Sequence, residues 1–294
     1  MSRMVRKQLL SMTDTLIKAN RALKINLPKA IKRKEELIQL LSDCQESAVS
    51  IGETVEKLYG EETETVAELE LVLRDRIVKR HIQNGVRVMD PSAVYIDPRV
   101  SIGRGTMVLP GSILRGETAV GRDCVIGPNA MVRDCTVGDE TEINASQANE
   151  SVIGSRTHVG PFAYIRPGCA IGDDIKVGDF VEVKNSTIGD GTKISHLTYV
   201  GDSDVGKKVN FGCGTVTTNY DGFKKYRCTI GDGAFLGCNT NLVAPVTVGG
   251  GSYTAAGSTV TEEVPPDALA VARSRQKNIE GWAARRRKLH GKDR

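Results

Sequence analysis

Residues 96–132 read IDPRVS IGRGTM VLPGSI LRGETA VGRDCV IGPNAM V, with one aliphatic residue at the head of each block of six. The rhythm continues to Val260, with one-residue resets and an irregular stretch at residues 147–150. A period of six fits neither the 3.6-residue turn of a helix nor the alternation of a hairpin. It predicts short strands with one inward aliphatic side chain each, separated by tight turns that use the conformational freedom of glycine.

Three such hexapeptides complete one triangular coil, and successive coils stack at the strand spacing of about 4.8 Å. Residues 94–262 would then form roughly nine coils of a β-helix, whereas a β-sandwich would show irregular turns about every 8–12 residues. The longest break separates Thr217 from Ile230 by thirteen residues instead of six. We therefore expect residues 219–225 to project as a loop, the part of a rigid scaffold where binding residues tend to lie.

The composition agrees with a narrow core that has little room for rings. Of 294 residues, 31 are glycine and only 4% are aromatic, without the Gly-X-Y period of collagen. Apolar residues make up 39% of the chain, which is enough to bury a core. No apolar run approaches the ~20 residues of a membrane span, and the basic N-terminus lacks an apolar signal core, so we expect a cytoplasmic protein.

The cysteines and charges exclude some sites and leave others open. Seven scattered cysteines form no C-x-x-C pair, so we expect free thiols and no metal site. The net charge of +4 gathers at the ends, because residues 1–34 carry ten Lys/Arg and one acid, and residues 273–294 carry nine and two. Basic ends can meet nucleic acid, an acidic membrane or a phosphorylated ligand. Solvated tails are the commonest explanation, and we expect no nucleic-acid partner.

The residues before the repeat are expected to be helical. Heptad spacings from Leu9 to Leu58 predict a helical hairpin or coiled-coil-like module over residues 1–62, either for oligomerisation or for an unknown protein partner. A linker helix should occupy residues 63–85 and end at Asn84–Gly85, with His81 solvated. The β-helix domain would follow at 86–264, with a basic C-terminal segment at 265–294.

Several long strings resemble one known family, the acetyltransferase domain of the bacterial bifunctional N-acetylglucosamine-1-phosphate uridyltransferase/glucosamine-1-phosphate acetyltransferase. They are GPFAYIRPG at 160–168, VGDFVEVK at 177–184, HLTYVGD at 196–202, TTNYDG at 217–222 and LVAPVTVG at 242–249. The similarity runs from about residue 68 to Trp282 and includes RDRIVKRH at 74–81, which resembles the family's linker helix. Nothing here matches the family's Leu-x-Ala-Gly-x-Gly-Thr nucleotide loop, so no uridyl transfer is expected.

The resemblance implies a left-handed parallel β-helix, a homotrimer with sites between subunits, and acetyl-CoA as the co-substrate. The implied reaction converts glucosamine-1-phosphate to N-acetylglucosamine-1-phosphate, a step toward UDP-N-acetylglucosamine and peptidoglycan. The thioester supplies an activated acyl group, so the reaction calls for no metal.

The resemblance also assigns roles to individual residues. His196 looks like the general base that accepts a proton from the sugar amine, a role that suits imidazole, and Glu182 is similar to the carboxylate that orients this base. Two cations, Arg166 and Lys184, look like the pair that binds the sugar phosphate. The positions that match other sugar contacts are Tyr199, Asn210 and Asn219.

A further set of positions resembles the acetyl-CoA site: Cys213, Asn219, Tyr220, Cys238, Ala256 and Arg273. Arg273 matches a contact to a coenzyme A phosphate. The family usually has serine where this chain has Cys238, and a thiol is a weaker hydrogen-bond donor than a hydroxyl. We therefore expect modestly altered activity or cofactor affinity, and regard an acetyl-cysteine intermediate at Cys238 as the less favoured alternative.

Two other functions are compatible with these residues. The same scaffold can acetylate another amino sugar, including a nucleotide-linked one. Alternatively, the chain is a catalytically weak trimeric scaffold that works through its N-terminal helices. The joint presence of His196, Lys184, Arg166, Asn219 and Tyr220 argues against the scaffold.

Overall fold

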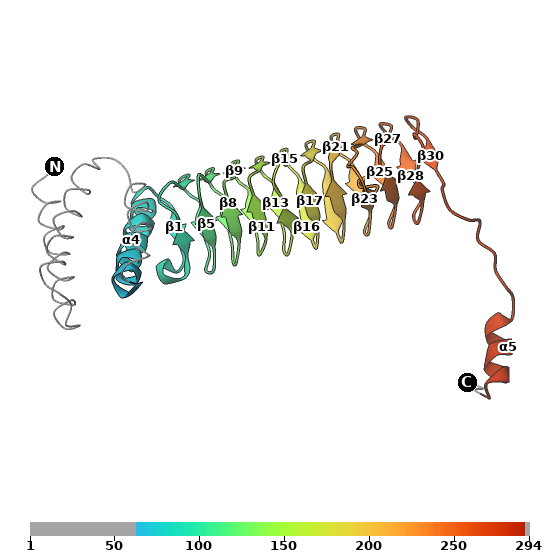
Figure 1. Cartoon of the computed structure of the whole chain (residues 1–294), viewed down its shortest axis with the longest axis horizontal. Helices are drawn as coiled ribbons and strands as arrows, with labels where there is room; N and C mark the ends of the chain where they lie inside the picture. Colours follow the sequence, from blue (N-terminus) through green and yellow to red (C-terminus); the bar gives the residue numbers. More distant parts are fainter. Residues whose placement is uncertain (1–62, 292–294) are drawn as a thin grey trace, which may run out of the picture.

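The computed structural model describes residues 63–291, and of residues 63–69 only the helical backbone is described. Helix α4 (Thr63–Gln83) leads into a long column of short strands, which ends in an extended segment and helix α5 (Trp282–Leu289) (Figure 1). The predicted hairpin of residues 1–62 lies outside the described residues. None of the described helices is long and apolar enough to cross a membrane.

The column has three parallel sheets, and from β1 to β26 each strand pairs with the strand three positions further along the chain. Sheet A contains β1 (Arg87–Val88), β4 (Met107–Val108), β7 (Val125–Ile126), β10 (Glu142–Ile143), β13 (His158–Val159), β16 (Lys176–Asp179), β19 (Lys193–His196), β22 (Asn210–Phe211), β25 (Phe235–Leu236), β28 (Tyr253–Thr254) and β30 (Leu269–Ala270). This order is the topology of a three-sided parallel β-helix.

The other two faces are built in the same way. Sheet B contains β2 (Tyr95–Ile96), β5 (Ile113–Arg115), β8 (Met131–Arg133), β11 (Gln147–Asn149), β14 (Tyr164–Ile165), β17 (Glu182–Lys184), β20 (Tyr199–Gly201), β23 (Val216–Thr218), β26 (Asn241–Val243) and β29 (Thr259–Val260). Sheet C contains β3 (Ser101–Ile102), β6 (Ala119–Val120), β9 (Thr136–Val137), β12 (Val152–Ile153), β15 (Ala170–Ile171), β18 (Thr187–Ile188), β21 (Ser203–Val205), β24 (Cys228–Ile230) and β27 (Val246–Val248). A short 3₁₀ helix, η1 (Pro91–Ala93), lies between β1 and β2.

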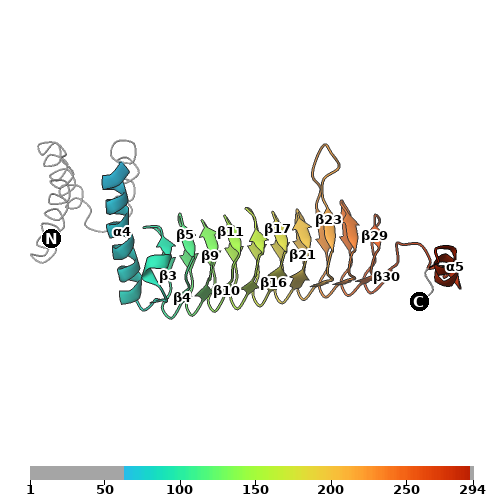
Figure 2. The same cartoon turned by 90° about the horizontal axis from the view of Figure 1, so that it is seen from below.

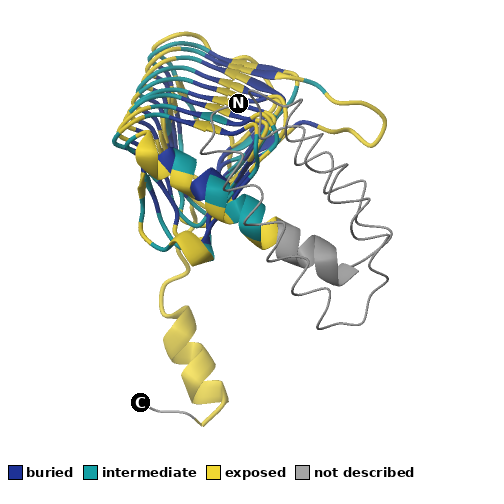
Figure 3. Ribbon diagram, turned by 90° about the vertical axis from the view of Figure 1, so that its left-hand side faces the viewer, coloured by how far each residue is buried: buried dark blue, intermediate teal, exposed yellow. Residues whose placement is uncertain are grey.

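The predicted mainly β, left-handed parallel β-helix is confirmed in its parallel, three-sided architecture. Residues at the heads of the hexapeptides point inward and are almost fully buried, as Leu114, Ile126 and Val132 show. Because they stack on the equivalent residue of the next coil, we expect removal of one such side chain to cost about 2–5 kcal/mol. Figure 3, a view along the column, shows the buried segments lining its interior.

A second buried row consists of small hydroxyl residues, and it explains the scarcity of aromatic residues. The hydroxyl of Thr106 donates to the carbonyl oxygen of Gly121 at 2.8 Å and accepts from the amide of Cys124 at 3.0 Å. Such a side chain satisfies backbone groups at a tight corner, where a ring would not fit. Coils also approach closely here, because a Cβ on Gly103 would lie 2.5 Å from the carbonyl carbon of Gly121.

Three details differ from the sequence-based expectations. The stretch 147–150 is regular, since β11 pairs with β8 and β14 and buries Ala148 as its inward residue. Ala148 is smaller than the Ile, Leu and Val residues that define the six-residue period, so the period does not reveal this strand. The strands also extend to Leu269–Ala270, beyond the expected end at residue 264. The domain boundaries otherwise remain predictions.

The third difference is His81, which is buried with 3% exposure rather than solvated. It lies in the last turn of α4, which ends near Asn84–Gly85 as expected. This turn packs over the first coil together with the buried Ile77 and Val78, so α4 closes the N-terminal end of the core. Among the described residues, the Nε2 atom of His81 has no hydrogen-bond partner.

The expected loop is present between β23 and β24, and it projects from the column in Figure 2. It closes on itself through an antiparallel bridge between Tyr220 and Lys225 and through two backbone amides that donate to Asp221 at 2.8 Å. Phe223 at its tip is 94% exposed. The loop is thus an ordered projection from the rigid column.

Candidate active site

The predicted site residues gather mainly at two corners of the column, one on each side of sheet B. We call the turn from sheet A to sheet B the A–B corner, and the turn from sheet B to sheet C the B–C corner. His196 ends β19 at the A–B corner, whereas Lys184 ends β17 at the B–C corner. Successive coils stack in register, so each corner carries a column of side chains about 4.8 Å apart.

At the A–B corner, His196 is paired with Asp179 of the preceding coil. The two residues are register partners in β19 and β16, and the Nδ1 atom of His196 lies 2.6 Å from Oδ1 of Asp179. This bond holds the pKa of the Asp179 carboxyl below its usual value. A carboxylate at Nδ1 favours the tautomer that carries its proton there, which leaves Nε2 as the acceptor for another molecule.

The carboxylate that contacts His196 is therefore not the expected one. Glu182, predicted to orient the base, places Oε1 2.8 Å from Nη1 of Arg166. Glu182 lies on sheet B, on the coil that precedes the coil of His196. In this chain it fixes the guanidinium of Arg166 instead of the imidazole of His196. The sequence held a signal for Asp179, because it stands 17 residues before His196, which is one coil.

From His196 toward the C-terminal end of the column, the A–B corner carries Cys213, Cys238 and Ala256 on successive coils. The register of β22 with β25 places Cys213 opposite Cys238. The amide of Asn239 donates to the carbonyl oxygen of Cys213 at 2.8 Å, and the amide of Gly257 donates to that of Cys238 at 2.8 Å. An equivalent bond runs from the amide of Leu197 to the carbonyl oxygen of Asp179 on the preceding coil. The corner residues Asp179, His196, Cys213, Cys238 and Ala256 therefore form one continuous column.

Arg273 lies beside the C-terminal end of this column. Its Cδ atom is 3.8 Å from the position that a Cβ on Gly257 would take, next to Ala256. A cation thus stands at the end of the column farthest from His196. The structure brings together His196, Cys213, Cys238, Ala256 and Arg273 on one edge of a single chain.

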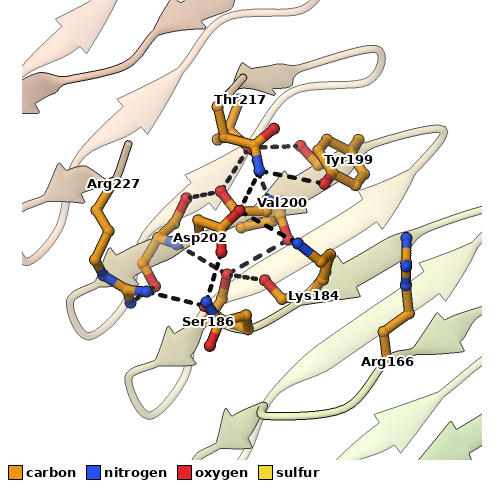
Figure 4. Close-up of polar contacts among 12 residues, drawn as sticks. Arg166, Lys184, Ser186, Tyr199, Val200, Asp202, Thr217 and Arg227 are labelled. Atoms are coloured by element: carbon orange, nitrogen blue, oxygen red, sulfur yellow. Dashed lines mark hydrogen bonds and ion pairs between the residues drawn. The ribbon is translucent and has the colours of Figure 1, made fainter. Parts of the chain in front are cut away.

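The B–C corner carries a hydrogen-bonded network around Asp202, a buried carboxylate that sequence reasoning did not assign a role. Asn185 donates to Asp202 at 2.5 Å, Asn219 donates to its other oxygen, and the Nζ atom of Lys184 lies 3.4 Å away. Burial alone would raise the pKa of Asp202, but these two amides and the ammonium together hold it below its usual value. Figure 4 shows Lys184, Tyr199 and Asp202 pointing toward one another, with Arg166 on the adjoining coil.

Lys225 is a second functional candidate that the sequence analysis missed. The contact and charge of the Lys184 ammonium lower the pKa of Lys225, and Arg166 adds to this effect. Three cations therefore converge at the B–C corner, where they meet two carboxylates, Asp202 beside Lys184 and Glu182 beside Arg166. Such a cluster has the charge and donors that can bind a dianion such as a phosphate monoester. The signal was the loop itself, which carries Lys224 and Lys225.

The remaining predicted residues are more scattered. The Oη atom of Tyr199 lies 3.5 Å from Nδ2 of Asn219, so both belong to the B–C corner. Tyr220 is exposed on the loop, where its hydroxyl donates to the carbonyl oxygen of Gly222 at 2.6 Å. Asn210 lies on the outer face of sheet A, between Lys193 and Phe235. Within the described part of the chain, no hydrogen bond or ion pair joins the two corners.

Comparison with known proteins identifies the relatives of this chain. The family described as the GMPPB C-terminal domain matches residues 81–188. The bifunctional protein GlmU of Acetivibrio thermocellus is 51% identical over 239 residues, which are 81% of this chain and 52% of that protein. The GlmU of Clostridium beijerinckii is 52% identical over 217 residues, 74% of this chain and 48% of its own length. The chain is homologous to GlmU.

The resemblance predicted from the motifs is confirmed by these GlmU relatives. The chain spans about half the length of the curated GlmU proteins that it matches. Among solved structures, the Arabidopsis UDP-N-acetylglucosamine acyltransferase matches with 14% identity and a TM-score of 0.39, covering 71% of this chain and 76% of that one.

Proposed function

We propose that this chain transfers the acetyl group of acetyl-CoA to the amine of glucosamine-1-phosphate, giving N-acetylglucosamine-1-phosphate and coenzyme A. The observation that carries the proposal is the His196–Asp179 pair at the foot of the column formed by Cys213, Cys238 and Ala256. About 50% identity to GlmU over three quarters of the chain supports it. Uridyl transfer is not part of the proposal.

His196 acts as the general base in the proposed mechanism. Its Nε2 atom accepts a proton from the neutral sugar amine as the nitrogen attacks the thioester carbonyl carbon. The tetrahedral intermediate then collapses, the carbon–sulfur bond breaks, and the departing thiolate of coenzyme A takes up the proton from the His196 imidazolium. Asp179 positions the imidazole and stabilises the imidazolium as it forms.

The sugar phosphate binds at the B–C corner, held by Arg166, Lys184 and Lys225. Glu182 holds Arg166 in place, and we assign it this role instead of the orientation of the base. Asp202 fixes Lys184 and Asn219. A planar guanidinium with two ammonium groups supplies donors and positive charge that suit a dianionic phosphate monoester. Tyr199, Asn210 and Asn219 are the proposed contacts to the sugar hydroxyls.

Acetyl-CoA lies along the A–B corner with its thioester near His196 and Cys238. The backbone of Cys213 and Ala256 accompanies the pantetheine arm, and Arg273 binds a phosphate of coenzyme A at the far end. Asn219 and Tyr220 belong to the B–C corner, so we propose that they contact the acetyl-CoA bound by a neighbouring subunit. The thioester is activated by itself, and the proposed reaction includes no metal.

A homotrimer joins the two half-sites in this proposal. The two corners lie on opposite edges of sheet B, so the A–B corner of one subunit would face the B–C corner of the next. An exposed apolar ridge supports this arrangement: Phe162 and Phe180 stack with ring centroids 5.5 Å apart beside Leu197, and all three are more than half exposed. Their positive φ values of 58°, 55° and 45° are costly for large side chains. A subunit contact would compensate for that cost and cover the ridge.

The test is release of coenzyme A thiol from acetyl-CoA in the presence of a panel of amines. We expect release with glucosamine-1-phosphate and weaker release with glucosamine, which lacks the phosphate. Release only with a different amino sugar would replace the proposed substrate. If no amine gives release of the thiol, the result would favour the alternative of a catalytically weak scaffold that functions through its predicted N-terminal helices.

A further inference from the structure

Cys213 and Cys238 are neighbours on the A–B corner, each on its own coil. β22 and β25 pair Asn210 with Phe235 and Phe211 with Leu236, and the same register two residues further pairs Cys213 with Cys238. The bond from the amide of Asn239 to the carbonyl oxygen of Cys213 shows that the register holds at the corner. The two Cα atoms are therefore expected about 4.8 Å apart.

This separation lies within the range of about 4.4–6.8 Å that a disulfide spans. The backbone at this corner is also held closely, because a Cβ on Gly212 would lie 2.5 Å from the amide nitrogen of Cys238. Glycines flank Cys213 on both sides, and Gly214 has a φ of +76°. Such a segment can adjust its φ and ψ by the small amount that the two sulfur atoms need in order to meet.

The environment distinguishes this pair from the other cysteines that the structure describes. Cys238 is exposed, Cys213 is partly exposed, and both are free thiols. Cys124, Cys135, Cys169 and Cys228 are buried in the core, and burial raises the pKa of each of their thiols. Thiols that are protonated and shielded from solvent react slowly with oxidants. Only the corner pair combines access with a partner among the described cysteines.

We propose that Cys213 and Cys238 form a reversible disulfide, with hydrogen peroxide as the oxidant, that closes the acetyl-CoA end of the A–B corner. The Cys238 thiolate attacks the peroxide, the O–O bond breaks, and a sulfenic acid and one water form. The Cys213 thiolate then attacks that sulfur, the S–S bond forms, and the hydroxide that leaves becomes a second water. Two electrons pass from the sulfurs to the peroxide, and a dithiol reverses the step.

The disulfide would act on the column next to His196, and this part of the proposal rests on the proposed function. Cys213 and Cys238 lie one and two coils above His196, where the thioester and pantetheine arm would bind. A cystine there fills the space between the two coils and removes the Cys238 thiol as a hydrogen-bond donor. Oxidation would thus block the acyl donor while leaving the phosphate-binding B–C corner unchanged.

The test treats the reduced full chain with hydrogen peroxide, alkylates the remaining thiols and digests the protein with trypsin. The expected product links peptide 209–224, which contains Cys213, to peptide 228–273, which contains Cys228 and Cys238. Fragment ions locate the link at Cys238. On a non-reducing gel the oxidised chain should run as a single chain, and dithiothreitol should release the two peptides.

A matched control is Cys228→Ser, which removes the buried thiol of the same peptide and should give the same link. Cys213→Ser and Cys238→Ser should give none. Affinity for desulfo-coenzyme A, which has no thiol to exchange, should fall by about tenfold or more on oxidation of the wild-type chain and recover after reduction. Neither single variant should show this oxidation-dependent loss.

The disulfide is detected by mass, so the test does not depend on the amine that the enzyme accepts. Absence of the cross-linked peptide would overturn the proposal even if the chain acetylates glucosamine-1-phosphate. A link that forms while desulfo-coenzyme A binds the oxidised and reduced chains equally would overturn the closing role. A link with loss of binding, but no acetyl transfer to glucosamine-1-phosphate, would refute only the proposed substrate.

Discussion

At the scale of single residues, the A–B corner shows that the groups most relevant to chemistry come from neighbouring coils. His196 could be found from the HLTYVGD string alone, but its partner Asp179 depends on the register of β16 and β19. Glu182 is the carboxylate that the family resemblance assigns to orient the base, yet in the structure it pairs with Arg166. The two carboxylates should therefore affect different kinetic constants.

We expect Asp179→Asn to lower kcat by about 10- to 100-fold with little change in KM for the sugar phosphate, because the amide neither fixes the tautomer nor stabilises the imidazolium. Glu182→Gln should mainly raise that KM, because Arg166 loses its anchor. Steady-state kinetics of both variants separate these effects. If Glu182→Gln lowers kcat and Asp179→Asn does not, Glu182 is the orienting carboxylate after all.

A second residue-scale prediction concerns Lys225, whose neighbour on the loop offers a control. Lys225→Ala should weaken binding of the sugar phosphate by about tenfold, since it removes one of three cations that face the anion. The Lys224 ammonium instead lies 4.6 Å from the centre of the Tyr226 ring. Lys224→Ala should therefore leave KM almost unchanged. Equal effects of the two substitutions would mean that the loop contributes only general charge.

At the scale of elements, most strands could be predicted from the six-residue period, because one inward aliphatic residue is the physical requirement of each strand. The exceptions are instructive. β11 was hidden by the small side chain of Ala148, which fills its inward position without a large aliphatic group. The burial of His81 was not visible either, because it arises from the packing of α4 against the first coil rather than from a local pattern.

This buried histidine makes stability depend on pH. Burial, with a smaller contribution from the charge of Arg80, lowers the pKa of His81 from 6.5 to about 4. Between these two pKa values, His81 binds a proton in the unfolded chain but not in the folded chain. The free energy of unfolding therefore decreases as the pH falls from about 6.5 to 4. The full contribution is about 3 kcal/mol, at about 1.4 kcal/mol per pKa unit.

Thermal unfolding at pH 7 and pH 5 should show part of this loss in the wild-type chain and a smaller decrease in His81→Leu. His290→Leu is the control, because His290 is exposed after α5. An identical pH dependence in wild type and His81→Leu would show that His81 does not titrate as its burial requires.

At the scale of the whole molecule, the long column presents the two halves of the proposed site on opposite edges of sheet B. The sequence predicted the column from its period and the homotrimer from its resemblance to the family. It did not reveal the ridge of Phe162, Phe180 and Leu197, because these residues stand at corners one coil apart rather than in the hexapeptide rhythm. Their stacking depends on register across coils.

The ridge allows the assembly to be tested without disturbing the fold. Phe180→Glu places a charge on a side chain that is 59% exposed in the single chain, so the core should remain intact. We expect it to shift the trimer toward monomers in sedimentation equilibrium and to lower activity in proportion. Phe223→Glu at the loop tip, which is 94% exposed, should leave the mass unchanged. A Phe180→Glu protein of wild-type mass would place the subunit contact elsewhere.

The most direct test of the proposed function is the rate of coenzyme A release from acetyl-CoA and glucosamine-1-phosphate by wild type and by His196→Ala. Circular dichroism should show the same fold for both, since His196 is exposed at the end of β19. General-base catalysis predicts that His196→Ala lowers kcat by about 100-fold or more. Equal rates in the two proteins would contradict the assignment of His196 as the base and, with it, the proposed active site.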